Sequence, residues 1–261
     1  MERKVKMNKK VQLIIKKFVN HYSENKDVQT KWKEPLVAYA DSMDEMFNNL
    51  RCIVSPSHAL PKDLLPEAKT VVTYFIPFDE MVIESNIEGK ESSEIWAKAY
   101  VETNQLILDL NVFIKSELKK LGYKSEITPA THNFDSKNLI SDWSHRHVAI
   151  ISGLGTFGLN NMLITDKGCC GRIGSFITDL KLEPTKRRTG ESCLYKHMGT
   201  CTKCVDRCVN EALTVDGFDR QKCYEMCLYN DKLHSGIGLC DVCGKCLVGV
   251  PCSTSNPVKT K

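Results

Sequence analysis

Apolar residues recur at helical spacing in two long segments of the chain. Over residues 11–22 they fall at steps of three and four, which predicts an amphipathic helix that packs against the body of the protein. The longest regular segment spans about residues 94–121 and has one continuous apolar stripe. The stripe comprises Trp96, Tyr100, Thr103, Ile107, Leu110, Ile114, Leu118 and Leu121. Ser92 or Ser93 can cap the start of this helix, and Gly122 can end it.

Four shorter apolar runs are typical of strands. Residues 36–39 form one, and residues 70–76 form a second that is rich in β-branched and aromatic side chains and stops at Pro77. Residues 147–151 and 173–180 give the other two. Side chains alternate along a strand, so His145 and His147 would share one face of an extended segment. Helices mixed with strands in this order predict an α+β fold.

Composition describes an ordinary globular chain. Of 261 residues, 26% are charged and 42% hydrophobic, a length that suits one large domain or two smaller ones. The polar stretch 184–190 reads as a linker, which predicts domains at 1–185 and 186–261. The net charge of +4 comes without a continuous basic stripe interleaved with aromatics, so charge does not indicate nucleic-acid binding. We expect no membrane segment, because no apolar run approaches the length of a span.

Ten of the thirteen cysteines lie between Cys193 and Cys252. Cys201 to Cys208 have the spacing C-x2-C-x3-C, and a second block of three follows at 240–246 with C-x2-C-x2-C. This rhythm is similar to that of the bacterial two-cluster ferredoxins, in which the fourth cysteine of each run ligates the other cluster. Paired zinc knuckles are the alternative, but three thiolates within eight residues favour iron–sulfur chemistry. Thiolate clusters need a reducing compartment and no secretion signal is evident, so we expect a cytoplasmic protein rather than a disulfide-bonded one.

Crossed ligation divides eight of these cysteines into two sets of four. Met198 stands where the ferredoxin pattern has a thiolate, and Cys193 is the nearest substitute. One predicted [4Fe-4S] cluster is then held by Cys193, Cys201, Cys204 and Cys252. The other is held by Cys208, Cys223, Cys243 and Cys246. Cys227 and Cys240 are left over, and Cys240 could displace Cys223 or Cys246.

Polar side chains that could donate protons gather before a glycine-rich turn. Asp142, His145 and Arg146 lie in SDWSHRH, and His132 lies a short loop upstream. Such groups could serve a reduction as proton donors, or they could form a hydrogen-bonded network that holds the loops of the domain. Likewise His58, in a loop bounded by prolines, could face a ligand or simply be exposed.

The turn itself fits G-x-G-x-x-G, with its glycines at Gly153, Gly155 and Gly158. A dinucleotide-binding unit needs a full helix after the glycines, and Lys167-Gly168 interrupts the chain too soon for one. The glycines still allow close approach of the backbone to a ligand. We therefore keep this turn as part of a candidate pocket.

Several of these motifs in order resemble one known family. GLGTFGLNNMLIT, then GRIGSFITDL, then the two cysteine blocks look like the epoxyqueuosine reductases and their relatives, the reductive dehalogenases. WSHRH and the CGKC-to-VPC ending are similar to a short iron–sulfur branch of that superfamily, and the resemblance covers about residues 32–252. It implies a nitroreductase-related α/β domain that holds cobalamin, followed by a ferredoxin-like module with two [4Fe-4S] clusters. In that picture the cofactor cleft is lined by Trp143, Ser144, His147, Gly153, Gly155 and Gly158.

The resemblance implies an oxidoreductase that passes electrons through the two clusters to a cobalamin. The alternative is an electron-transfer protein or reductive activator of a separate corrinoid protein, without a tightly bound cobamide of its own. Either function needs a low-potential donor of the ferredoxin or flavodoxin type. The chain ends soon after Cys252, without the helical-repeat extension of the tRNA-modifying members. We therefore expect a small-molecule or corrinoid-protein substrate rather than tRNA.

Overall fold

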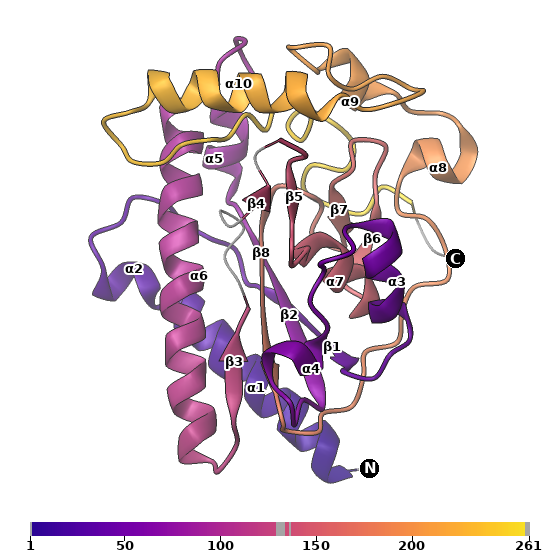
Figure 1. Ribbon diagram of the computed structural model, residues 1–261. Coiled ribbons are helices and arrows are strands. Elements are labelled where there is room, and N and C mark those ends of the chain that lie inside the picture. Colours follow the sequence, from indigo (N-terminus) through magenta and orange to yellow (C-terminus); the bar gives the residue numbers. More distant parts are fainter. Residues whose placement is uncertain (1, 129–133, 136, 259–261) are drawn as a thin grey trace.

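A four-stranded antiparallel sheet forms the centre of the molecule. The computed structural model describes residues 2–128, 134, 135 and 137–258 (Figure 1). The sheet has the strand order β1-β2-β8-β3, formed by Leu36–Asp41, Thr70–Pro77, Gly171–Thr178 and Ser125–Ile127. The strands β2 and β8 pair along their whole length, from Thr70 opposite Thr178 to Pro77 opposite Gly171. Every residue of β2 is buried, so β2 is the middle of the core.

Helices cover both faces of this sheet. On one face, α1 (Glu2–Asn20) and α6 (Glu94–Lys120) pack their apolar stripes against Tyr74 of β2 and Phe176 of β8. On the other face lie α3 (Met46–Ile53), α4 (Pro61–Leu64) and α7 (His145–Ile151). The short α2 (Tyr22–Asn25) and α5 (Glu80–Ser85) complete this part of the chain. The mixed α+β fold predicted from the sequence is confirmed.

Predicted elements and observed elements agree at the long segments. The helix predicted over 94–121 is α6, and the hydroxyl of Ser93 caps it by accepting a hydrogen bond from the Trp96 N–H. Gly122 follows the helix with φ +82°, a left-handed conformation that favours glycine. The strands predicted at 36–39, 70–76 and 173–180 correspond to β1, β2 and β8.

The strand predicted over 147–151 is wrong, because these residues form the helix α7. Val148 and Ile151, three positions apart, are buried against the sheet, so packing sets the conformation of this β-branched run. Two residues along a helix differ by about 200° in direction. His145 and His147 therefore do not share a face, contrary to the expectation from alternation.

The cysteine-rich segment lies along one end of the sheet and of α6 (Figure 1). It contains α8 (Leu194–Met198), α9 (Lys203–Asp206) and α10 (Arg220–Leu233). Two small hairpins, β4–β5 (Phe134–Asp135 with Ile140–Ser141) and β6–β7 (Gly155–Phe157 with Leu163–Thr165), lie between β3 and β8 along the chain. No helix in the described part combines the length and apolar character that crossing a bilayer demands.

The predicted linker 184–190 contains no helix or strand, yet it is attached to the sheet. The Thr185 N–H donates to the Tyr39 carbonyl oxygen at 2.8 Å, and the Tyr39 N–H donates to the Thr185 hydroxyl at 3.0 Å. The C-terminal end returns to the N-terminal part, where the Cys169 N–H donates to the Cys252 carbonyl oxygen at 3.0 Å. The predicted boundary at 185/186 remains a prediction.

Candidate functional site

Four of the predicted cluster ligands surround one cavity. Cys193, Cys201, Cys204 and Cys252 line one small pocket that is partly open to solvent, together with the turn between β6 and β7. Cys193 precedes α8, Cys201 follows it, Cys204 lies in α9 and Cys252 lies near the C-terminus. Within the described residues, no three Cys, His, Asp or Glu side chains lie close enough together to bind a single metal ion. The four thiols therefore line the same pocket without meeting at a point.

Burial and mutual repulsion disfavour thiolates in this cavity. Burial raises the pKa of Cys204 to about 12, and negative charge on Cys252, Cys193 and Cys201 adds to the effect. A bound metal removes this penalty, because it deprotonates a coordinating thiol outright. The donor set fits a metal–sulfur group, and four thiolates are the usual ligands of a [4Fe-4S] cluster.

The cysteines of the second predicted set influence one another electrostatically. Burial raises the pKa of Cys246 well above its usual value, and charges on Cys243, Cys223, Cys208 and Cys204 follow as causes. Burial, followed by the charges of Cys223 and Cys208, likewise raises the pKa of Cys243 to about 11. The four predicted ligands are therefore electrostatic neighbours of one another. The charge of Cys204, which belongs to the first set, also raises the pKa of Cys246, so the two sets are adjacent.

The two cysteines left over take different positions. Cys240 is fully buried, its N–H donates to Asp231 Oδ1 at 2.7 Å, and burial followed by the charges of Asp231 and Asp241 raises its pKa. This position among carboxylates favours the assignment in which Cys240 belongs to neither set. Cys227 lies one turn from Cys223 on α10, and its hydrogen bond lowers the pKa of Cys223 to about 7 against the opposing effect of burial.

Cys169 and Cys170 were missed by the sequence reasoning, although two adjacent cysteines are a visible signal. Both are buried at the start of β8. The thiol of Cys169 hydrogen-bonds with those of Cys170 and Cys252. The hydrogen bond to Cys170 raises the pKa of Cys169, and a negative charge on Cys246 raises it further. Cys169 therefore lies between the two predicted ligand sets.

Lys245 of the CGKC sequence is a buried cation beside the second set. Its side chain is 1% exposed, and its ammonium donates to the carbonyl oxygens of Asn86 at 2.9 Å and Glu88 at 2.6 Å. Burial lowers the pKa of Lys245, while the charge of Cys243 acts in the opposite direction. A buried positive charge here offsets the negative charge of neighbouring thiolates.

Ser175 on β8 holds the SDWSHRH segment against the sheet. Its hydroxyl oxygen lies 3.1 Å from the donor Nε1 of Trp143, 2.9 Å from Nδ1 of His145 and 3.1 Å from the hydroxyl of Thr128. The hydroxyl has one hydrogen, so it accepts from Trp143 and donates to only one of the other two. Sequence reasoning had no signal for Ser175, because its partners are at least 30 residues away.

We expect Ser175→Ala to lower the free energy of unfolding by about 1–3 kcal/mol, because it leaves the buried indole N–H of Trp143 without an acceptor. Thr128→Val is the matched control, since it removes a partner of Ser175 but leaves the Trp143 bond in place. The free energies of unfolding of the two variants and the wild type are measured by urea denaturation. A loss in Ser175→Ala no larger than that in Thr128→Val would contradict the assigned role.

His147 is held away from His145 and is neutral near pH 7. Its ring packs edge-on against Phe157 with centroids 4.9 Å apart, and its Nδ1 lies 2.7 Å from the Ser144 hydroxyl oxygen. Burial, followed by the positive charge of Arg146, lowers the pKa of His147 from 6.5 to about 4.

This pKa predicts a loss of stability between about pH 6.5 and pH 4, because the unfolded chain binds a proton there that the folded ring excludes. His147→Asn can keep a bond to Ser144 and cannot titrate. Over that interval the variant should lose about 1–2 kcal/mol less stability than the wild type. Urea unfolding at a series of pH values measures this difference, and equal pH slopes would rule it out.

The remaining predicted proton donors are dispersed. Arg146 donates to the Asn161 carbonyl oxygen at 2.8 Å. Asp142 is exposed and accepts a hydrogen bond from the Ser57 hydroxyl. The prediction for His132 falls outside the described residues. His145 is thus the predicted donor that the structure fixes against the sheet.

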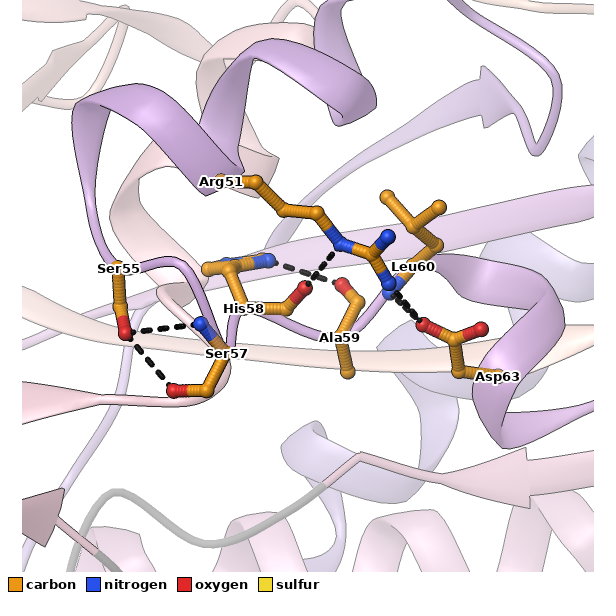
Figure 2. Close-up of polar contacts among 7 residues, drawn as sticks. All are labelled: Arg51, Ser55, Ser57, His58, Ala59, Leu60 and Asp63. Atoms are coloured by element: carbon orange, nitrogen blue, oxygen red, sulfur yellow. Dashed lines mark hydrogen bonds and ion pairs between the residues drawn. The ribbon is translucent and has the colours of Figure 1, made fainter.

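His58 is buried and serves to position α7. Its Nε2 accepts from the Ser144 N–H at 3.0 Å, so its Nδ1 carries the proton and donates to the Ala59 carbonyl oxygen at 2.8 Å. Figure 2 shows the loop around it, where Arg51 bonds both the His58 carbonyl oxygen and Asp63. The ring of His58 also stacks on that of Trp143, with centroids 5.6 Å apart. This histidine is therefore a structural part of the segment that precedes α7.

The three glycines of the G-x-G-x-x-G sequence serve a hairpin. Gly153 follows α7 with φ +86°, and a Cβ on Gly155 would lie 2.2 Å from the Ile164 carbonyl oxygen, where no side chain fits. Gly158 lines the thiol cavity. No helix follows the glycines, since β6 and β7 pair directly. This agrees with the expectation that the motif is not a dinucleotide-binding unit.

Most of the residues predicted to line a cobamide cleft are buried or contact other parts of the protein. Trp143 has no exposed surface, Gly155 abuts the backbone of β7, and Ser144 and His147 bond each other. These residues do not form an open cradle for a corrin ring. The cysteine thiols thus fit the ligand set of iron–sulfur clusters. The residues predicted to line the cobamide cleft do not fit a corrin ring comparably.

Curated proteins similar to this chain are epoxyqueuosine reductases, whereas no family model matches it. The chain is 26% identical to the Staphylococcus aureus enzyme over 201 residues, which covers 70% of this chain and 48% of the relative. It is 27% identical to the Bacillus cereus enzyme over 198 residues, with the same coverage. The Synechocystis enzyme is 26% identical over 211 residues, 73% of this chain and 66% of the relative. The chain thus spans about half the length of the first two relatives.

Solved structures share the fold. An epoxyqueuosine reductase from Streptococcus thermophilus superposes with a TM-score of 0.55 at 18% identity, covering 87% of this chain and 65% of that one. An epoxyqueuosine reductase bound to a modified tRNA-Tyr stem loop gives 0.54 at 20% identity, with coverage of 93% and 66%. A catabolic reductive dehalogenase gives 0.51 at 16% identity, with coverage of 72% and 26%.

Proposed function

We propose that the chain is an oxidoreductase of the kind represented by the epoxyqueuosine reductases that it resembles, and that it relays single electrons through two [4Fe-4S] clusters. The observation that carries this proposal is the pocket lined by Cys193, Cys201, Cys204 and Cys252. The second cluster would be held by the neighbouring thiols of Cys208, Cys223, Cys243 and Cys246. Each cluster, when bound, supplies a centre that accepts and releases one electron.

The protein's own residues would support such a relay in three ways. The buried ammonium of Lys245 offsets thiolate charge, and the thiol of Cys169 lies between the two sets. His145, fixed by Ser175, would deliver protons on the α7 side. Electrons would come from a low-potential donor of the ferredoxin or flavodoxin type, and the reducing conditions that thiolates need support a cytoplasmic location.

The electron acceptor is proposed to be a small molecule or a corrinoid protein. A cobamide bound by the chain itself is the prediction from the superfamily, and the enclosed Trp143 gives it no support. An electron-transfer role toward a separate corrinoid protein is the second candidate, favoured by that same observation. tRNA is not proposed as a substrate, because the basic residues form no continuous stripe with interleaved aromatics.

Electron paramagnetic resonance on anaerobically reconstituted protein with added cob(II)alamin tests both candidates. Two cluster signals after reduction are expected in either case. A changed cobalt signal would indicate a cobamide site on the chain. An unchanged signal of free cob(II)alamin would favour the electron-transfer role, and the absence of cluster signals would overturn the proposal.

A further inference from the structure

The indole N–H of Trp96 is a buried hydrogen-bond donor that lacks an acceptor. Trp96 lies in the first turn of α6 and is 2% exposed, and its Nε1 has no hydrogen-bond partner among the described residues. The other two tryptophans of the chain are satisfied. Trp32 Nε1 donates to the Thr103 hydroxyl at 2.7 Å, and Trp143 Nε1 donates to the Ser175 hydroxyl at 3.1 Å. An indole nitrogen can only donate, and a buried donor without an acceptor destabilises the fold.

Trp96 lies against the loop that carries two predicted ligands of the second cluster. In this loop, Gly244 and Lys245 separate Cys243 from Cys246. A Cβ placed on Gly244 would lie 2.3 Å from Trp96 Cζ2 and 2.6 Å from Trp96 Nε1, so no side chain fits between the indole and the loop. Cys246 also packs against the apolar cluster that contains Trp96. The unpaired N–H is therefore beside the backbone that joins the two predicted ligands.

Hydrogen bonds hold the start of α6 against this loop. The Asn86 side chain accepts from the Ser93 N–H and donates to the Cys243 carbonyl oxygen, and both distances are 2.9 Å. Further along α6, the Tyr100 hydroxyl donates to Asp241 Oδ1 at 2.7 Å. These two attachments lie before and after the indole along the helix, so they fix its position relative to the loop.

We propose that the Trp96 indole N–H donates a hydrogen bond to a sulfur atom of the second [4Fe-4S] cluster and so raises the reduction potential of that cluster. The inference rests on the proposed function, because a cluster held by Cys243 and Cys246 supplies the acceptor that the N–H lacks. Reduction adds negative charge to the sulfur atoms, so a donor stabilises the reduced cluster more than the oxidised one. Hydrogen bonds to the sulfurs are among the factors that set the potential of such clusters.

Redox titrations of the reconstituted full-length chain, followed by electron paramagnetic resonance, test the effect on the potential. Trp96→Phe keeps an aromatic ring and removes the N–H. It should lower the potential of one cluster, the one whose signal Cys246→Ala removes, and leave the other cluster as in the wild type. Trp32→Phe is the matched control, because it removes an indole N–H that already has an acceptor on α6. This control should leave both potentials unchanged.

Nitrogen-15 in the indole rings detects the hydrogen bond in the wild-type chain itself. Pulsed electron paramagnetic resonance on the reduced protein should show coupling of the second cluster to one indole nitrogen. The coupling should disappear in Trp96→Phe and persist in Trp32→Phe. The wild type carries the signal by itself, so its presence or absence decides the matter even if Trp96→Phe fails to fold.

Two results would overturn the inference while both clusters are present. One is the absence of indole nitrogen coupling in the wild type, which would assign the N–H to another acceptor such as a buried water molecule. The other is an unchanged pair of potentials in Trp96→Phe, which would show that the indole only fills space beside the loop. A chain that binds no iron would overturn the proposed function and this inference with it. Iron content measured on each sample separates these cases.

Discussion

Cys246→Ala should lose one of the two clusters and lower the iron content from about eight to about four atoms per chain. Cys246 is half-buried, and Cys208, Cys223 and Cys243 are its electrostatic neighbours, which places it in the second predicted ligand set. A cube left with three protein ligands in this position would be unstable to reconstitution. Iron and acid-labile sulfide analysis after anaerobic reconstitution measures the change.

Cys240→Ala is the matched control, because it removes a buried cysteine from the same loop. Cys240 lies beside Asp231 and Asp241, and the variant should keep about eight iron atoms. Loss of iron in Cys240→Ala with retention in Cys246→Ala would reverse the assignment. It would place Cys240 in the second ligand set instead of Cys246.

Trp143→Ala should lower the free energy of unfolding by about 3–5 kcal/mol, the range for removing a large aromatic side chain from a core. Trp143 has no exposed surface and packs with Phe47, Val148 and Ile177. The substitution also takes away the hydrogen bond to Ser175 and the stacking partner of His58. Urea unfolding followed by circular dichroism measures the loss.

Trp143→Phe separates packing from hydrogen bonding. It keeps most of the apolar contact but not the indole N–H, so its loss should be smaller, about 1–2 kcal/mol. If Trp143 instead lined an open cofactor cleft, Trp143→Ala would leave stability nearly unchanged. That result would restore the role in cofactor binding that the sequence suggested.

The long regular elements could be predicted because their signals are local. A stripe of apolar residues over more than seven turns and the cap at Ser93 were sufficient for α6. The run before Pro77 was sufficient for β2, which is buried on both faces. Such segments are determined by periodicity and by breakers within the segment itself.

The helix α7 could not be predicted in the same way. Its apolar residues Val148 to Ile151 are β-branched or small, and as a short run they fit a strand as well as a helix. The sheet beneath Val148 and Ile151 decides between the two, and only the tertiary structure supplies that information.

The candidate site, like the fold, could be predicted from the sequence only in part. Cysteine spacing predicts two sets of four thiols, because a cluster imposes a rhythm on the sequence, and this division stays a prediction. Ser175 and Cys169 carried no such rhythm. Each acquires its role from partners far away in the chain, such as Trp143, which lies 32 residues from Ser175.

Mössbauer spectroscopy on the wild-type chain reconstituted with iron-57, combined with zinc analysis, tests the central claim most directly. The predicted result is a spectrum of two [4Fe-4S] clusters, about eight iron atoms per chain, and no bound zinc. One zinc ion in each thiol set, with no iron that survives desalting, would contradict the electron-relay account entirely.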